Sequence, residues 1–192
     1  MIAIVKYKAG NIKSVSTALD RLGFRSVITD NESDLLNADK VILPGVGEAG
    51  TAMKSLKENG LDRIICSLKM PVLGICLGLQ LLCRYSEESA TTCLGIFDSA
   101  IRKFPPEDKV PHMGWDNFLW CGGKIFNGIE AKDNLYYVHS YYAELSEHTI
   151  AVCDYILPFS AAMQKDNFFA TQFHPEKSGD VGAKIFENFL KL

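Results

Sequence analysis

The sequence predicts an α/β protein with a doubly wound, mostly parallel central sheet, helices on both faces and an additional antiparallel β region. Three observations support this fold class. In the first part of the chain, short apolar runs alternate with helical patterns, which is typical of strands joined by crossover helices. Residues 93–171 instead carry short β-prone runs separated by turn signals such as Pro105-Pro106 and Gly122-Gly123. The segment from Val181 to Leu190 then has apolar residues at helical spacing.

The individual elements can be taken in chain order. Residues 2–5 form a continuous apolar run that predicts a buried strand. A helix is expected next, closed by Gly23, with its apolar stripe on Ile12, Val15, Leu19 and Leu22. Further strands are predicted at 25–29, 41–43 and 72–75, a helix at 52–68 with an interruption near Gly60, and a last helix whose apolar face carries Val181, Ile185, Phe189 and Leu190.

Composition and charge indicate a single globular domain. With 192 residues, 47% of them hydrophobic, the chain can bury a substantial core, and one domain over residues 1–192 is expected. The net charge of −3 and the lack of a Lys/Arg-rich block argue against nucleic acid or an anionic membrane surface as a partner. The longest apolar stretch, 72–83, contains Gln80 and is shorter than the roughly 20 residues of a membrane helix, so no membrane span is expected.

The first residues and the cysteines bear on the compartment. The chain starts with apolar residues and reaches Lys6 only afterwards, which reverses the order of a secretion signal. Six cysteines are present without a Cys-x-x-Cys pair, so a cytoplasmic location is expected and a metal site is not. Five cysteines are expected to pack in the core, namely Cys66, Cys83, Cys93, Cys121 and Cys153, and three histidines are expected to be structural, namely His112, His139 and His148.

Cys76 is set apart by its surroundings, Gly74-Ile75-Cys76-Leu77-Gly78-Leu79-Gln80, which follow the apolar pair Val72-Leu73. A cysteine between two glycines, where a strand passes into a helix, is typical of a nucleophile exposed on a sharp turn. The glycines are expected to permit backbone torsions and close approaches that a Cβ would block. The helix N-terminus would favour the thiolate. The sequence therefore predicts that Cys76 is a nucleophile.

A histidine and a carboxylate follow far downstream in His174-Pro175-Glu176. The preceding residues, 168–173, are apolar and β-prone, and Pro175 disfavours helix at His174. The segment is therefore expected to be extended, so that the side chains of His174 and Glu176 point the same way. With Cys76 they supply the parts of a triad: a nucleophile, a general acid and base, and a carboxylate that orients the imidazole.

The two motifs together, Gly74 to Gln80 and Phe173 to Glu176, resemble the class I glutamine amidotransferases. Within that family, four segments are similar to the glutaminase subunits of imidazole glycerol phosphate synthases: Pro44 to Gly50, Pro111 to Trp115, Val138 to Tyr141 and Phe173 to Gly179. The resemblance runs from the first predicted strand to the last helix. It implies the flavodoxin-like fold of the family and no cofactor.

The resemblance also implies roles for residues outside the triad. Gly45, Val46 and Gly47 follow a predicted strand, and their amides would stabilise an oxyanion, although a Gly-x-Gly pair alone is more often an ordinary turn. Four further residues would recognise the amino-acid end of L-glutamine, namely Gln80, Glu88, Ser140 and Tyr141.

The reaction implied by the resemblance is hydrolysis of the glutamine side-chain amide. The Cys76 thiolate would attack the carbonyl, His174 would protonate the departing ammonia, and water would then release glutamate from a thioester. The implied partner is a cyclase with a (β/α)8 barrel, which would use the ammonia to form imidazole glycerol phosphate and an aminoimidazole carboxamide ribotide in histidine biosynthesis.

Three alternatives remain open from the sequence. Lys6, Lys8 and Asp116 depart from residues common in that branch, which leaves room for a paralogue that feeds ammonia to a related barrel in nucleotide-sugar or surface-polysaccharide synthesis. A stand-alone cysteine hydrolase would use the same elbow without a partner. A catalytically silent regulatory subunit is disfavoured, because all three types of triad residue are present.

Overall fold

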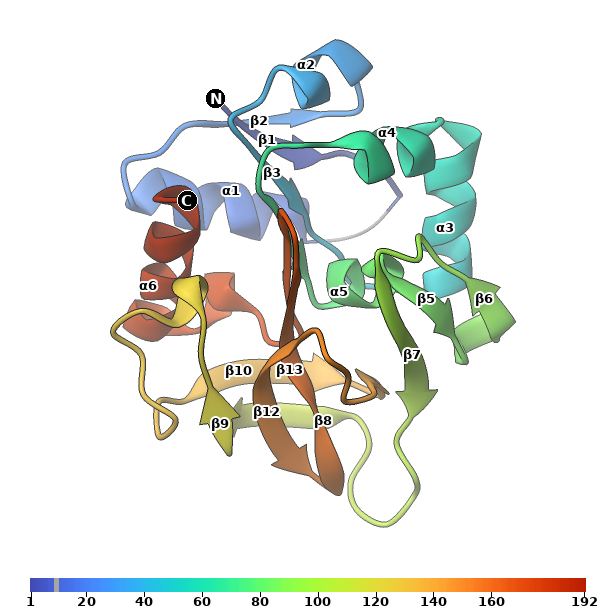
Figure 1. The fold of residues 1–192 in the computed structure, drawn as a ribbon, viewed down its shortest axis with the longest axis vertical. Helices are drawn as coiled ribbons and strands as arrows, with labels where there is room; N and C mark the ends of the chain where they lie inside the picture. The colour runs from blue at the N-terminus through green and yellow to red at the C-terminus, as the bar shows by residue number, and fades with distance from the viewer. Residues whose placement is uncertain (9–10) are drawn as a thin grey trace.

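The computed structural model describes residues 1–8 and 11–192, which are built around one large sheet (Figure 1). The sheet has eight strands in the order β2-β1-β3-β4-β14-β13-β12-β9. Its strands in chain order are β1 (Ile2–Val5), β2 (Ser26–Thr29), β3 (Lys40–Leu43), β4 (Val72–Ile75), β9 (Trp120–Cys121), β12 (Thr149–Tyr155), β13 (Leu157–Lys165) and β14 (Phe168–Thr171).

The sheet has a parallel and an antiparallel half that meet at β14. Strands β2, β1, β3, β4 and β14 are parallel neighbours, and β13, β12 and β9 extend the sheet in antiparallel order. Counted along the chain, the parallel strands have the order 2-1-3-4-5, which is that of flavodoxin-like folds. Ligands in such folds bind beyond the carboxyl ends of the strands.

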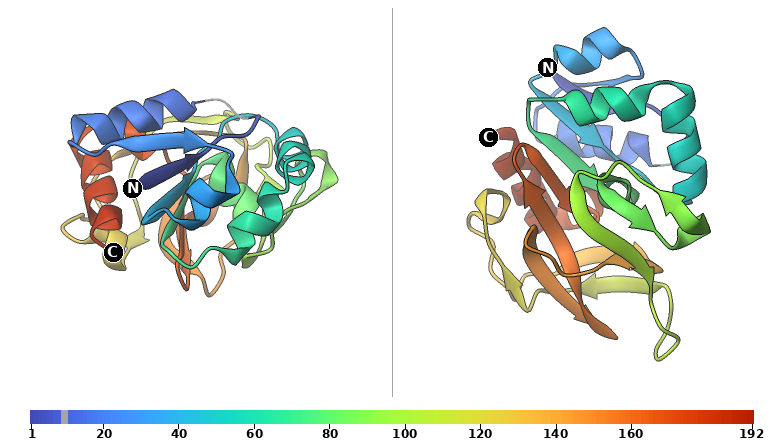
Figure 2. Two further views of the ribbon diagram at one scale, coloured as in Figure 1. Left: turned by 90° about the horizontal axis from the view of Figure 1, so that it is seen from above. Right: turned by 45° about the vertical axis from the view of Figure 1, so that its right-hand side comes forward.

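Helices cover both faces of the parallel half. α1 (Ile12–Arg21) and α6 (Gly179–Leu190) lie on one side, and α3 (Ala49–Glu58), α4 (Leu61–Ser67) and α5 (Leu77–Leu82) on the other (Figure 2). The alternation of side chains along β1 explains this, because Ala3 and Val5 join one buried cluster while Ile2 and Ile4 join the other. The predicted fold class is therefore confirmed.

Two smaller sheets complete the antiparallel region. One has the order β11-β7-β5-β6 and is formed by β5 (Cys83–Ser86), β6 (Thr91–Thr92), β7 (Phe97–Lys103) and β11 (Tyr141–Ala143). The other is a two-stranded ribbon of β8 (His112–Asp116) and β10 (Leu135–His139). Only Ser140 lies between β10 and β11, so the chain changes sheets at this residue.

Several elements differ from the sequence-based expectation. The helix expected from residue 52 begins at Ala49, because the side chain of Glu48 accepts hydrogen bonds from Gly50 N and Thr51 N and so caps it. A short helix, α2 (Glu32–Leu36), was not predicted, although Asn31 caps it from a typical N-cap position. Short 3-10 turns occur at η1 (Glu88–Ala90), η2 (Lys124–Phe126) and η3 (Pro175–Lys177).

The core-packing expectation for the cysteines is only partly met. Cys83 and Cys153 are buried, but Cys66 is exposed, and Cys93 and Cys121 are only partly buried. Cys66 lies near the end of α4, on the side that turns away from the sheet, so helical periodicity and not residue type decides its exposure.

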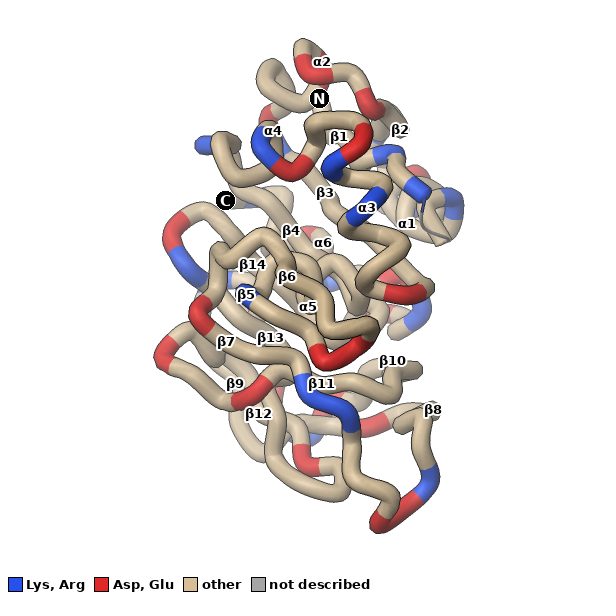
Figure 3. The backbone as a smooth tube through the Cα atoms, turned by 90° about the vertical axis from the view of Figure 1, so that its right-hand side faces the viewer, with Lys and Arg blue, Asp and Glu red and all other residues tan. Residues whose placement is uncertain are grey.

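The distribution of charged residues and the hydropathy of the helices can be described for the folded chain. Lys and Arg alternate with Asp and Glu along the backbone, without a long run of one sign (Figure 3). Within the described ranges, no helix is both long enough and apolar enough to cross a bilayer.

Candidate active site

Cys76 lies on the turn between β4 and α5, as the elbow motif predicts. It adopts φ 52° and ψ −105°, so the residue that carries the unusual torsion is the cysteine itself. The flanking glycines serve close approach: a Cβ on Gly78 would lie 2.0 Å from the carbonyl oxygen of Leu43, and one on Gly74 would lie 2.9 Å from that of Gly78. The expectation that the glycines supply the torsions was wrong, whereas the close approaches are present.

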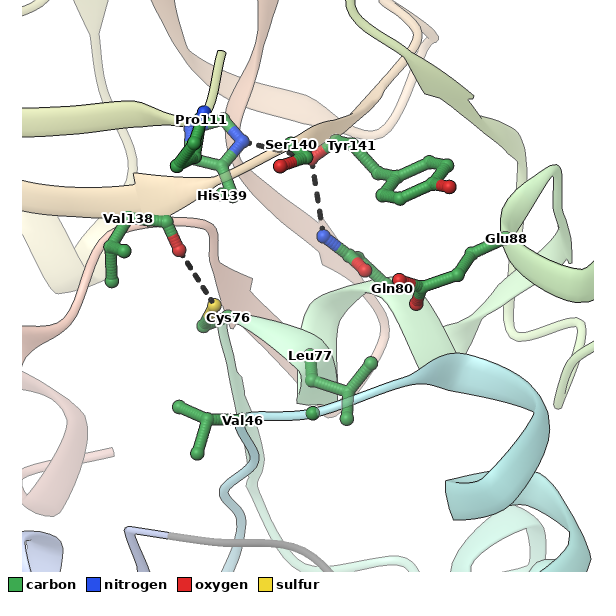
Figure 4. Close-up of a pocket in the computed structure, with 11 residues that line it drawn as sticks. Val46, Cys76, Leu77, Gln80, Glu88, Pro111, Val138, His139, Ser140 and Tyr141 are labelled. Carbon is green, nitrogen blue, oxygen red and sulfur yellow. Dashed lines mark hydrogen bonds between the residues drawn. The ribbon is translucent and has the colours of Figure 1, made fainter.

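A cavity of about 360 Å³ opens beside this turn (Figure 4). Its walls include Val46 and Gly47 of the loop after β3, together with all four residues expected to recognise glutamine: Gln80, Glu88, Ser140 and Tyr141. Cys76 lines the cavity although its side chain is almost buried, with 6% of the residue exposed. Residues from five separate stretches of sequence therefore converge on one pocket.

Gln80 is held by two hydrogen bonds that orient its amide. Its Nε2 donates to the carbonyl oxygen of Tyr141 at 3.2 Å and to Oε1 of Gln172 at 3.2 Å. Gln172 in turn donates from Nε2 to Sγ of Cys76 at 3.6 Å. Gln172 was not among the predicted site residues, although a fully buried amide after an apolar strand is the kind of polar exception that marks a site.

Glu88 reaches the pocket from η1. Its Oε2 accepts a hydrogen bond from Ala49 N at 2.8 Å, at the start of α3. Burial raises the pKa of the Glu88 carboxyl, and the negative charge of Glu48 adds to this against the hydrogen bond from Ala49. Glu48 itself is half-buried, and hydrogen bonds led by that of Ser89 lower its pKa to about 2.

His174 and Glu176 lie together in the interior. Nδ1 of His174 and Oε1 of Glu176 are 2.8 Å apart, and their side chains are 1% and 0% exposed. His174 is extended at φ −103° and ψ 97°, as predicted, but η3 begins at Pro175. The expectation of a continuous extended segment was therefore wrong, and a tight turn brings the two side chains together.

The other ring nitrogen of His174 is buried. Nε2 has no hydrogen-bond partner among the described residues. Burial, the largest influence, would lower the pKa of this imidazole, but the neighbouring Cys76 and then Glu176 outweigh it and raise the pKa to about 10. The site thus favours a protonated imidazole at His174.

Asn11 completes the surroundings of Glu176 and was not predicted. It precedes α1 with a left-handed φ of 70°, and its Nδ2 donates to the same Oε1 of Glu176 that faces His174. A carboxylate held by two donors keeps one orientation.

The loop after β3 is tied to the elbow. Tyr7 donates from its hydroxyl to the carbonyl oxygen of Pro44 at 2.6 Å, and a Cβ on Gly45 would lie 2.5 Å from that hydroxyl. The amide of Leu77 donates to the carbonyl oxygen of Gly45 at 3.3 Å. Val46 and Gly47 face the cavity, with Gly47 at φ +130°, whereas Gly45 is not part of the cavity wall.

His139, expected to be structural, also lines the cavity, while its neighbour His112 is buried behind it. His148 is nearly buried on the far side of Phe97, with ring centroids 5.9 Å apart. In residues 1–8 and 11–192, no group of three or more His, Cys, Asp or Glu side chains is placed to hold a metal ion.

The family model for class-I glutamine amidotransferases matches residues 3–192. The chain is 57% identical to the imidazole glycerol phosphate synthase subunit HisH of Bacteroides fragilis (strain YCH46), over 100% of this chain and 99% of that protein. It is 44% identical to the HisH subunit of Pasteurella multocida (strain Pm70), over 99% of this chain and 97% of that protein.

Solved structures share the fold at lower identity. PurLQS from Thermotoga maritima aligns with a TM-score of 0.74 at 18% identity, covering 99% of this chain and 97% of that one. A glutamine amidotransferase from Thermotoga maritima aligns with a TM-score of 0.64 at 16% identity, covering 99% of this chain and 82% of that one. At these identities, the likeness concerns the fold alone.

Proposed function

This chain belongs to the class-I glutamine amidotransferase family, and we propose that it is the glutaminase subunit of an imidazole glycerol phosphate synthase. In this proposal it hydrolyses L-glutamine to glutamate and ammonia within histidine biosynthesis. The observation that carries the proposal is the full-length match to HisH subunits, and it is supported by the Cys76 elbow beside a pocket and by the pairing of His174 with Glu176. We place the reaction in the cytoplasm, because a working thiolate needs a reducing compartment.

The chemistry follows from the site. The Cys76 thiolate attacks the side-chain carbonyl of glutamine, and the imidazolium of His174 protonates the departing ammonia from Nε2. A glutamyl thioester remains. His174 then takes a proton from water as the water attacks the thioester, and glutamate leaves. Glu176 holds Nδ1 of His174 throughout and stabilises the charged ring.

The oxyanion needs amide donors that the resting loop does not offer freely. The amide of Leu77 is engaged by the carbonyl oxygen of Gly45. Rotation of the peptide between Gly45 and Val46 would remove that carbonyl and present the Val46 amide, so that two donors face the oxyanion. Because this charge exists only in the transition state, the rotation would act mainly on kcat.

Four residues of the pocket are proposed to bind the amino-acid end of glutamine: Gln80, Glu88, Ser140 and Tyr141. Glu88 offers a carboxylate to the substrate ammonium, since only one of its oxygens is engaged by Ala49 N. Gln80 and the Ser140–Tyr141 corner supply further polar groups to the wall of the pocket (Figure 4).

The proposed partner is a cyclase with a (β/α)8 barrel. Ammonia in neutral water is mostly ammonium, which is not nucleophilic, so the product must pass to the partner without crossing solvent. Two large apolar side chains of β8 are unusually exposed, Met113 at 57% and Trp115 at 59%, which supports a protein contact at this ribbon.

The test uses the Cys76→Ala variant in complex with a cyclase of the imidazole glycerol phosphate synthase type. We expect glutamine-dependent synthesis of imidazole glycerol phosphate to be lost and synthesis from added ammonia to remain. Full glutaminase turnover by Cys76→Ala would refute the elbow assignment. Efficient wild-type turnover that no cyclase changes would instead favour a stand-alone hydrolase.

A further inference from the structure

A buried pair of histidines lies directly behind the glutamine pocket. His112 on β8 and His139 on β10 face each other in the ladder, and Nδ1 of His112 lies 3.2 Å from Nε2 of His139. The outer nitrogens are also engaged. Nε2 of His112 lies 3.2 Å from Oδ2 of Asp116, and Nδ1 of His139 lies 2.8 Å from the carbonyl oxygen of Tyr141.

If each contact in this chain is a hydrogen bond, the chain needs one more proton than two neutral imidazoles carry. The carbonyl of Tyr141 only accepts, so Nδ1 of His139 carries a proton. Burial, the largest influence, lowers the pKa of His139 to about 3, so its Nε2 is unprotonated and accepts from Nδ1 of His112. A neutral His112 would then turn a lone pair toward the carboxylate of Asp116. A third proton between Nε2 and Oδ2 resolves this conflict.

The side chains packed around the two histidines are mainly aromatic rings that do not ionise here. The ring of His112 lies between those of Tyr137 and Tyr155, at centroid distances of 4.9 and 4.0 Å and interplanar angles of 20° and 10°. Burial raises the pKa of both phenols, so both rings stay neutral. Phe104 and Phe159 pack on His139.

Asp116 is the acid that faces His112 directly. The pKa of His112 is lowered overall, because burial outweighs the opposing charge and hydrogen bond of Asp116, so the third proton depends on the 3.2 Å contact between Nε2 and Oδ2. Cys153 faces Asp116 as well as Tyr137, and burial, the largest influence, raises the pKa of its thiol. The other titratable groups near this cluster are more distant neighbours: Cys121 beside Tyr137, Asp108 beside Tyr155 and His174 beyond His139.

The chain of contacts ends on the wall of the pocket. The carbonyl oxygen of Tyr141 that accepts from His139 also accepts from Nε2 of Gln80 at 3.2 Å. Between them lies Ser140, where the chain passes from the β8–β10 ribbon to the neighbouring sheet. The ring of His139 therefore spans this corner from one sheet to the other and fixes the carbonyl that orients Gln80.

We propose that His112 and Asp116 are positioning residues that share one proton and thereby lock His139 across the Ser140 corner, holding the glutamine-binding wall in place. This inference rests on the proposed function for its substrate. When the proton leaves, one contact in the chain becomes repulsive and the wall loosens. The His112–Asp116 pair acts on the binding of glutamine and not on the chemistry at Cys76, so its loss changes KM more than kcat.

The first test observes the proton and does not depend on activity. Histidine ring nitrogens are followed by NMR in the wild-type chain, Asp116→Asn and Asp154→Asn from about pH 5 to about pH 9. In the wild type, the signals of His112 and His139 should shift together at one pH. In Asp116→Asn the amide donates to Nε2 without an added proton, so this shared transition should vanish. Asp154→Asn removes the same charge from an exposed position on β12 and should titrate like the wild type. Independent titration of the two rings, or no transition in the wild type, would overturn the shared proton.

The second test measures KM and kcat for glutamine in the complex with the cyclase over the same range. As the pH rises and the shared proton leaves, we expect the KM of the wild type, divided by the KM of Asp116→Asn, to rise about threefold or more. Asp154→Asn should behave like the wild type. The ratio of the kcat of the wild type to that of Asp116→Asn should stay constant. A KM ratio that does not change with pH would refute the positioning role even if the NMR transition is present. Failure of all three proteins to hydrolyse glutamine would refute the proposed function and leave the NMR result standing.

Discussion

Replacing Gly78 by alanine tests how the elbow is positioned. By helix propensity alone, this change should stabilise α5 by about 1 kcal/mol. The structure predicts the opposite, because the added Cβ would lie 2.0 Å from the carbonyl oxygen of Leu43, where ordinary contact begins at 3.4 Å. The difference, 3.4 minus 2.0 or 1.4 Å, is the distance by which α5 and β3 must separate.

That displacement sets the expected magnitudes. Overpacking of this kind costs about 1–3 kcal/mol, and a shift of about 1 Å in a catalytic group costs on the order of 100-fold in rate. We therefore expect kcat for glutamine to fall about 100-fold in Gly78→Ala, with the Tm lowered by roughly 2–8 °C.

The assay is steady-state glutaminase kinetics together with thermal unfolding. Gly122→Ala is the control, since its Cβ would meet only the half-exposed ring of Trp120, at 3.3 Å. Wild-type kcat and Tm in Gly78→Ala would refute the reasoning that close approach to β3 positions Cys76.

Three further predictions concern the triad and its loop. Glu176→Gln should keep the ring of His174 in place but fail to stabilise its charge, lowering kcat by up to about 10⁴-fold; steady-state kinetics equal to the wild type would move this role to another carboxylate. Because the resting loop engages the amide of Leu77, the free chain should turn over glutamine slowly and a nucleotide-loaded cyclase should raise kcat more than it changes KM; a free chain as fast as the complex would contradict this. The raised pKa of His174, about 10 against about 6.5 in an unfolded chain, means that its stabilising contribution is complete below about pH 6.5 and is lost as the pH rises through about 10. Denaturant midpoints should therefore fall less between these pH values in Cys76→Ala, which lacks the thiolate, and equal slopes would argue against the ion pair.

Local patterns were sufficient to predict the parts of the fold that depend on local chemistry. The apolar runs of β1, β3 and β4 are buried on both faces, so they are visible without knowledge of the partner strands. The glycines around Cys76 predict a close approach, which the structure places against Leu43. The short strands β6 and β9 have two residues each and too little pattern to predict.

Residues that act across long sequence separations could not be found this way. Asn11 meets Glu176 across 165 residues, and Gln172 meets Cys76 across 96. Neither contact leaves a periodicity, because each depends on which strands become neighbours in the sheet. His139 was noticed in the sequence but expected to be structural, because a buried histidine usually is. Only the three-dimensional arrangement reveals that it borders the pocket.

The seam between the two halves of the sheet has a consequence for variation of the chain. Cys76 and His174 follow the neighbouring strands β4 and β14, which are paired from Phe168 and Val72 to Thr171 and Ile75. This pairing holds the ends of β4 and β14 one interstrand spacing apart, about 4.8 Å, whatever the length of the chain between the two strands. Insertions or deletions in the chain between the two strands, for example around the exposed residues 106–109, change the periphery and leave this strand pairing untouched. The placement of Cys76 and His174 after two paired strands therefore does not depend on loop length.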